Sequence, residues 1–79
     1  MIRQKQEICL LTFENTHEAM RFEALAAAAG LNGRLIPLPG QIRAGCGLAW
    51  RSPAALYDSV VKLAEEREIK DSEIHRLLL

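Results

Sequence analysis

The segment EICLLTFENTHEAMRFEALAAAAG, residues 7–30, contains the pattern from which the architecture of the chain can be worked out. Its first part, Glu7–Phe13, is mostly apolar and rich in strand-forming residues, which is typical of a central strand covered on both faces. Asn15 or Thr16 can cap a helix directly afterwards, and Asn15 with Glu18 has the spacing of a capping box. The segment therefore predicts a strand that leads at once into a helix.

A helix is predicted from Glu18 to Ala29, because small and apolar side chains recur there at helical spacing and form one face. The inward-facing positions are Ala19, Phe22, Ala26 and Ala29, with Leu25 at the edge of the face. Gly30 follows at the position where a helix favours a residue with left-handed backbone geometry. The helix is therefore expected to end at this glycine.

Two further strands are predicted in the middle of the chain. Gly33–Leu38 has a strand pattern, but Pro37 and Pro39 cannot donate ladder hydrogen bonds, so this strand is expected at a sheet edge. Gly40–Gly45 is expected to form a loop, and Cys46–Arg51 another short strand.

The last third of the chain contains a second predicted helix and an ambiguous tail. Ser52-Pro53 has the composition of a cap followed by proline at the first helical position. The inner face of the helix is then formed by Leu56, Val60, Leu63 and Ala64. The tail Ile69–Leu79 can close the sheet as a strand over Ile74–Leu79 or continue as a helix, and periodicity does not separate these alternatives.

The order strand, helix, strand, strand, helix and a possible last strand is the split βαβ pattern of ferredoxin-like α+β folds. We expect an antiparallel sheet with two helices on one face, and the first and third strands side by side at its centre. The start of the third strand then lies beside the end of the first.

Composition limits what the chain can do. Its 79 residues make one domain, expected to span 1–79 with residues 1–6 as a frayed lead-in. Ten basic and ten acidic side chains give zero formal net charge, so the overall field does not draw in nucleic acid. The longest apolar stretch, Ala24–Ala29, is far shorter than the roughly 20 residues that a membrane helix needs. The run Ile8–Phe13 is too short for the core of a signal peptide. We expect a cytoplasmic protein without nucleic-acid or membrane partners.

Cys46 is the residue most suited to chemistry. If it opens the third strand, it lies near Phe13–Asn15 and so near the N-terminus of the first helix, where unpaired N–H groups carry about half a positive charge. A thiolate at such a position is stabilised. Gly45 and Gly47 flank Cys46, which leaves the backbone unshielded and lets a bulky partner approach. The other interpretation is a small buried hydrophobic residue, and both stay open at this point.

Four neighbours are candidates to support such a thiolate. Thr16 and His17 stand at the start of the first helix, and an imidazole can donate or accept a hydrogen bond. A first-turn histidine can equally face solvent. Arg43 and Arg51 are close in sequence and can add positive charge.

Cys9 differs from Cys46, because its place in mid-strand between Ile8 and Leu10 favours a packed, inert thiol. In the expected register Cys9 faces the far end of the third strand, near Trp50. About four residues of roughly 3.4 Å each then separate the two cysteines, too far for a disulfide. We predict two free thiols of unequal reactivity, with Trp50 packed in the core. No pair of candidate ligands has zinc-site spacing, so neither a metal nor a cofactor is expected.

Three runs of residues resemble a known family when taken together. They are Thr12-Phe13-x-Asn15-Thr16-His17-x-Ala19, Ile36-Pro37-x-Pro39 and Cys46-Gly47-Leu48-Ala49, and they stand in the same order in small selenium/sulfur (Se/S) carrier-like proteins. The resemblance covers about residues 8–67. It implies a ferredoxin-like domain in which Cys46 is the carrier residue.

The chain departs from this family at two places. Relatives carry an arginine and an acidic residue after the second proline, where this chain has Gly40 and Gln41, so an anion-binding role there would fall to Arg43. The tail Ser72–Leu79 does not clearly match the closing strand of the family.

The resemblance implies a carrier rather than an enzyme. Cys46 would hold sulfur or selenium as a persulfide or selenylsulfide, with a donor enzyme and an acceptor protein as partners. The alternative is a non-catalytic ligand-binding or regulatory module in which the cysteine is structural, and a homodimer is compatible with either. An acyl- or phosphoryl-hydrolysing enzyme would need an arginine-bearing phosphate loop after the first strand, which Glu14-Asn15-Thr16 does not offer.

Overall fold

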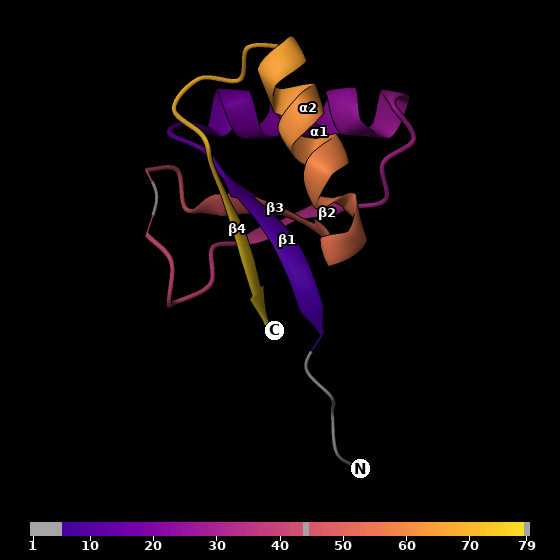
Figure 1. Ribbon diagram of the computed structural model, residues 1–79. Helices are drawn as coiled ribbons and strands as arrows, with labels where there is room; N and C mark the ends of the chain where they lie inside the picture. The colour runs from indigo at the N-terminus through magenta and orange to yellow at the C-terminus, as the bar shows by residue number, and fades with distance from the viewer. Residues whose placement is uncertain (1–5, 44, 79) are drawn as a thin grey trace.

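The chain folds in the order that the sequence predicts (Figure 1). The computed structural model describes residues 6–43 and 45–78, and within these ranges the chain forms four strands, two α-helices and a 3-10 turn. The elements are β1 (Glu7–Thr12), α1 (Thr16–Ala28), β2 (Arg34–Pro37), β3 (Leu48–Pro53), η1 (Ala54–Leu56), α2 (Tyr57–Glu66) and β4 (Glu73–Leu78). This is the βαββαβ order of a ferredoxin-like α+β fold. Of the lead-in expected at residues 1–6, only Gln6 lies among the described residues.

The sheet has the strand order β2-β3-β1-β4, and every neighbouring pair is antiparallel. The expected central pair is therefore confirmed. Thr12 at the end of β1 is opposite Ala49, so the start of β3 lies beside the end of β1. Both helices lie on the same face of the sheet (Figure 1). This topology brings the residues around position 46 close to the start of α1.

Strand β1 is covered on both faces, as its apolar sequence predicts. Its side chains Cys9 and Leu11 pack in the core beneath the helices, where Phe22 of α1 and Val60 of α2 are also fully buried. On the other face Ile8 and Leu10 are equally buried. Two side chains of the β2–β3 loop, Leu38 and Ile42, pack there and take the place that a second helical layer would have.

Helix α1 begins and ends largely as expected. The Asn15 side chain accepts a hydrogen bond from the Glu18 backbone N–H at 2.9 Å, which identifies Asn15 as the N-cap. Gly30 adopts a φ of +77° after the last turn. The prediction that Ala29 lies on the inner face is wrong, because the helix ends at Ala28 and Ala29 is the exposed C-cap.

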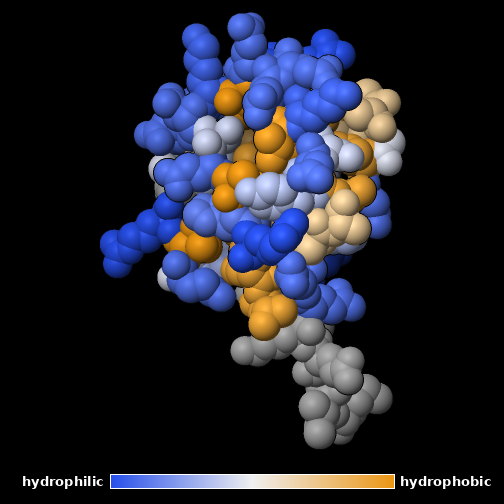
Figure 2. All heavy atoms as spheres, viewed as in Figure 1, coloured by the Kyte–Doolittle hydropathy of each residue, from blue (hydrophilic) through white to orange (hydrophobic). Residues whose placement is uncertain are grey.

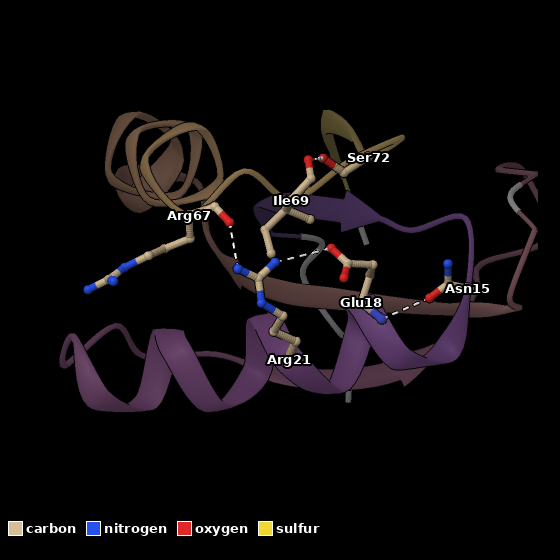
Figure 3. A network of polar contacts seen from close by, with 6 residues as sticks. All are labelled: Asn15, Glu18, Arg21, Arg67, Ile69 and Ser72. Atoms are coloured by element: carbon tan, nitrogen blue, oxygen red, sulfur yellow. Dashed lines mark hydrogen bonds and ion pairs between the residues drawn. The ribbon is translucent and has the colours of Figure 1, made fainter.

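The Glu18 carboxylate has a different partner from the one a capping box gives it. Arg21 pairs with this carboxylate at 3.4 Å and donates a second hydrogen bond to the Arg67 carbonyl at 2.7 Å (Figure 3). Just beyond, the Ser72 hydroxyl donates to the Ile69 carbonyl at 3.3 Å. Arg21 therefore joins the first helix to the end of the second.

The predicted cap at Ser52-Pro53 is wrong, and so are the predicted bounds of the third strand. Ser52 is opposite Cys9 and Pro53 is opposite Ile8, so both residues belong to β3, which runs from Leu48 to Pro53. Ladder pairing with β1 outweighs the local cap signal, and the helical backbone begins only with the 3-10 turn at Ala54.

The ambiguous tail forms strand β4 at the edge beside β1. Its apolar side chains alternate, because Ile74 packs on the helix side of the sheet and Leu77 on the other side. The end of the predicted strand, residue 79, lies outside the described residues.

At the opposite edge, β2 is as short as its prolines predict. Within β2 the Leu35 N–H donates to the Glu23 carboxylate of α1 at 3.3 Å. A side chain of the helix thus occupies one donor on the exposed edge.

Hydrophobic side chains reach the surface in small groups among hydrophilic ones on the face seen in Figure 2. Met20 and Leu78 are the large apolar residues that are most exposed among those described. Within the described ranges no helix has both the length and the hydrophobicity to span a bilayer.

Candidate functional site

Cys46 lies in the turn that leads into β3, two residues before the strand begins. The expected strand start at Cys46 is therefore wrong by two residues. The physical reason is Gly47, whose φ of +73° is incompatible with an extended strand. The turn leaves the Cys46 side chain half-buried against the edge of the helix-side core, next to Leu48.

Gly45 holds this turn against the end of β1. A Cβ atom at position 45 would lie 2.5 Å from the Glu14 carbonyl oxygen and 3.3 Å from the Glu14 Cδ atom, so only glycine allows this approach. Glu14 directly precedes the N-cap Asn15. The residue before Cys46 therefore touches the segment from which α1 starts.

The start of α1 offers hydrogen-bond donors in this region. The Glu18 amide donates to the Asn15 side chain, and the Ala19 amide donates to the Asn15 carbonyl at 3.3 Å. Within the described chain the amides of Thr16 and His17 have no partner, as is usual for the first amides of a helix. The side chains of both residues are exposed.

The Cys46 sulfur itself makes a local contact. Its S–H donates to the Leu48 carbonyl oxygen at 3.5 Å, two residues along the chain. Among the described residues the thiol makes no other hydrogen bond. The predicted neighbours Thr16, His17 and Arg43 therefore do not form hydrogen bonds with the Cys46 sulfur. The Leu48 contact could not be predicted from sequence patterns, because it depends on the left-handed turn at Gly47.

The two arginines considered with Cys46 are placed differently. Arg43 is exposed in the β2–β3 loop, three residues before the cysteine. Arg51 is opposite Leu10, whose side chain belongs to the core on the far face of the sheet. Arg51 therefore points away from the helix side, where Cys46 packs.

Cys9 and Cys46 are both free, and their surroundings differ as predicted. Cys9 is completely buried, and this burial raises the pKa of its thiol, although the neighbouring Ser52 side chain and the charge of Arg76 act in the opposite direction. The predicted register is wrong by two residues, because Cys9 is opposite Ser52 and Leu11 is opposite Trp50.

Trp50 packs in the core, as the sequence predicts. Trp50 is fully buried, and its ring meets that of Phe22 edge-on, with 5.1 Å between centroids. Gly33 provides the space for the indole, because a Cβ atom there would overlap with the Trp50 ring. Across the ranges that the structure describes, His, Cys, Asp and Glu side chains form no cluster of three that could hold a metal ion.

Comparison with known proteins agrees with the resemblance of the sequence motifs. No match was found among the curated proteins or the solved structures. The family model described as "Putative Se/S carrier protein-like" matches residues 8–76. The match extends past residue 67 and through most of β4, so the tail fits the family better than its sequence suggested. Because this match covers most of its length, the chain belongs to the Se/S carrier protein-like family.

Proposed function

We propose that this protein carries a sulfur or selenium atom on Cys46 and passes it from a donor enzyme to an acceptor protein. The observation that carries the proposal is the contrast between its two free thiols. Cys9 is sealed in the core, whereas Cys46 is half-buried in a glycine-flanked turn packed against the start of α1. Membership of an Se/S carrier-like family agrees with this role.

The transfer is a thiol exchange. The Cys46 thiolate attacks the outer sulfur of a persulfide on the donor enzyme, the S–S bond of the donor breaks, and the donor cysteine leaves as a thiolate. Cys46 then holds the atom as a persulfide, or as a selenylsulfide when selenium is transferred. An acceptor thiolate attacks the same outer atom in the second step and regenerates the Cys46 thiolate. The chain begins and ends this cycle unchanged, so it acts as a carrier.

The start of α1 lies beside the turn that carries Cys46. The N-terminus of a helix carries partial positive charge, which attracts an anionic group presented from an adjacent turn. At that terminus the backbone amides of Thr16 and His17 have no hydrogen-bond partner among the described residues. Arg43 is exposed in the same loop as the cysteine and adds positive charge for docking of an acidic partner surface.

The flanking glycines have separate roles in the proposal. Gly45 sets the position of the turn, because no side chain fits between it and Glu14. Gly47 has open space around its Cα atom, so a partner can approach the sulfur from that side. Gly47 also needs its positive φ to direct the Cys46 sulfur toward the Leu48 carbonyl.

A loading experiment tests the function. The protein is incubated with a cysteine desulfurase and cysteine, and its intact mass is then measured under non-reducing conditions. The wild type and a Cys9→Ala variant are expected to gain one sulfur atom, and a Cys46→Ser variant is expected to gain none. Circular dichroism confirms that each variant is folded. Sulfur gained by folded Cys46→Ser would overturn the proposal.

A further inference from the structure

Two arginines lie directly opposite each other on the face of the sheet that the helices do not cover. Arg34 of β2 is the register partner of Arg51 of β3. Arg34 is two residues from Ile36, and Arg51 is two residues from Ala49. Both apolar residues pack in the core of the open face, so the arginine side chains project to that same face.

This pair carries two like charges at short range. Residues opposite each other in an antiparallel pair have Cβ atoms about 5 Å apart, and like charges in such a pair are destabilising. Within the described chain neither guanidinium has a carboxylate at ion-pair distance, whereas Arg21 pairs with Glu18 and Arg76 pairs with Glu7. Among the described residues, the positive charge of Arg34 and Arg51 is therefore not compensated by an ion pair.

The two arginines line a pocket at the end of the sheet where β1 and β2 begin and β3 ends. The pocket has a volume of about 240 Å³. Gln6 and Asn32 are among the polar residues of its lining, and Ile8 and Pro53 are apolar residues of the same lining. No acidic side chain belongs to this lining among the described residues. The described lining of the pocket thus includes two arginines and two residues with side-chain amides.

We propose that this pocket binds a phosphate group of a small molecule between Arg34 and Arg51. A phosphate monoester carries close to two negative charges, which balance the two guanidinium charges. Guanidinium groups form paired hydrogen bonds with phosphate oxygens, and Gln6 and Asn32 can donate to the remaining ones. The volume is below the usual range of roughly 300–1,000 Å³ for drug-sized ligands, so the phosphate and a short adjoining group fill it.

The phosphate site is separate from Cys46. Arg51 is opposite Leu10, whereas the turn that holds Cys46 precedes the other end of β3 and packs on the helix side of the sheet. The proposal therefore does not depend on the carrier function, and a variant at one site is expected to leave the other site intact.

Thermal unfolding in the presence of inorganic phosphate tests the proposal. The comparison is with sodium chloride at the same ionic strength, because salt alone screens the repulsion between the arginines. Saturating phosphate is expected to raise the melting temperature of the wild type by about 4 °C or more beyond the chloride effect. Arg34→Ala and Arg51→Ala are expected to lose this increment. Arg67→Ala is the matched control: its side chain has no ion pair within the described chain, and it is expected to keep the increment.

Backbone amide chemical shifts give a second measurement that does not depend on stability. Phosphate is expected to move the amide signals of residues 32–34 and 51–52 and to leave those of α2 unchanged. Arg51→Lys keeps the charge but loses the paired donors, so it is expected to bind phosphate at least about tenfold more weakly. Equal melting shifts with chloride, an equal loss in Arg67→Ala, or amide shifts spread over the whole surface would each overturn the proposal.

Discussion

Gly45 packs directly on the backbone of Glu14, so that a Cβ atom at position 45 would lie 2.5 Å from the Glu14 carbonyl oxygen. This contact joins two segments that are 31 positions apart in the sequence. It sets the turn that carries Cys46 against the residues that begin α1.

Replacing this glycine is expected to displace the turn. Gly45→Ala forces a methyl group against backbone atoms that cannot rotate away, and we expect a loss of about 1–3 kcal/mol in the free energy of unfolding. Urea denaturation measures the loss, and the desulfurase assay is expected to show slower loading of Cys46. Gly40→Ala is the matched control, because a Cβ atom at Gly40 meets nothing within 4 Å. Equal stability of the two variants would contradict the role given to the Gly45 contact.

The two thiols are expected to react at different rates. Cys9 has no exposed surface and must wait for the core to open, whereas Cys46 reacts in the folded state. Alkylation of the native protein with iodoacetamide is expected to modify Cys46 faster by a factor of about 100 or more. Peptide mass spectrometry distinguishes the sites. In denaturant the two rates should become similar, and similar rates without denaturant would show that the burial of Cys9 does not protect it.

The stability of the protein is expected to fall at alkaline pH because of Cys9. Burial raises the pKa of this thiol above its ordinary value of 9.0, so the unfolded chain loses its proton at a lower pH than the folded chain does. The contribution of the buried Cys9 thiol to the free energy of unfolding is fully present below pH 9.0 and is lost as the pH rises through the raised pKa. Each unit of difference corresponds to about 1.4 kcal/mol.

Urea denaturation of the wild type and of Cys9→Ala between neutral and alkaline pH isolates this effect. The difference in the free energy of unfolding between the two proteins is expected to shrink above pH 9.0, because only the wild type contains the buried thiol. A difference that stays constant with pH would contradict the assignment.

The two helices end in the same way but with different residues. After α1 the left-handed position is Gly30, and after α2 it is Glu68, with a φ of +53°. Glu68→Gly removes the steric cost of a side chain in this conformation, and we expect it to stabilise the protein by about 1 kcal/mol. The reverse change, Gly30→Ala, is expected to destabilise it by a similar amount. Thermal unfolding measures both, and a destabilised Glu68→Gly would show that the glutamate side chain makes a compensating contact.

Local patterns were sufficient for the first half of the fold. In the segment 7–30 the strand, the cap at Asn15 and the left-handed Gly30 could be predicted because they depend on neighbours in sequence, whereas the inward position predicted for Ala29 is wrong. Ser52-Pro53 could not, because its local cap signal competes with pairing to β1, more than 40 residues away in the chain. The tail was undecided for the same reason, since β4 is stabilised as a strand by that neighbour.

The candidate site was predictable only in its general location. The adjacency of Cys46 to the start of α1 follows from the strand order, but the shift of the cysteine out of β3 depends on the backbone at Gly47. The opposed pair Arg34 and Arg51 was not visible in the sequence, because it requires the register between β2 and β3. Registers of this kind are set by three-dimensional packing and turn geometry.

The most direct test of the carrier account follows one sulfur atom through a complete cycle. The protein is loaded by a cysteine desulfurase, separated from it, and then mixed with an excess of a small thiol. Peptide mass spectrometry after alkylation is expected to find the additional sulfur on Cys46 before mixing, and a free Cys46 thiol with persulfide on the small thiol afterwards. Sulfur that appears on Cys9, or that stays on Cys46 in the presence of the acceptor, would contradict the account.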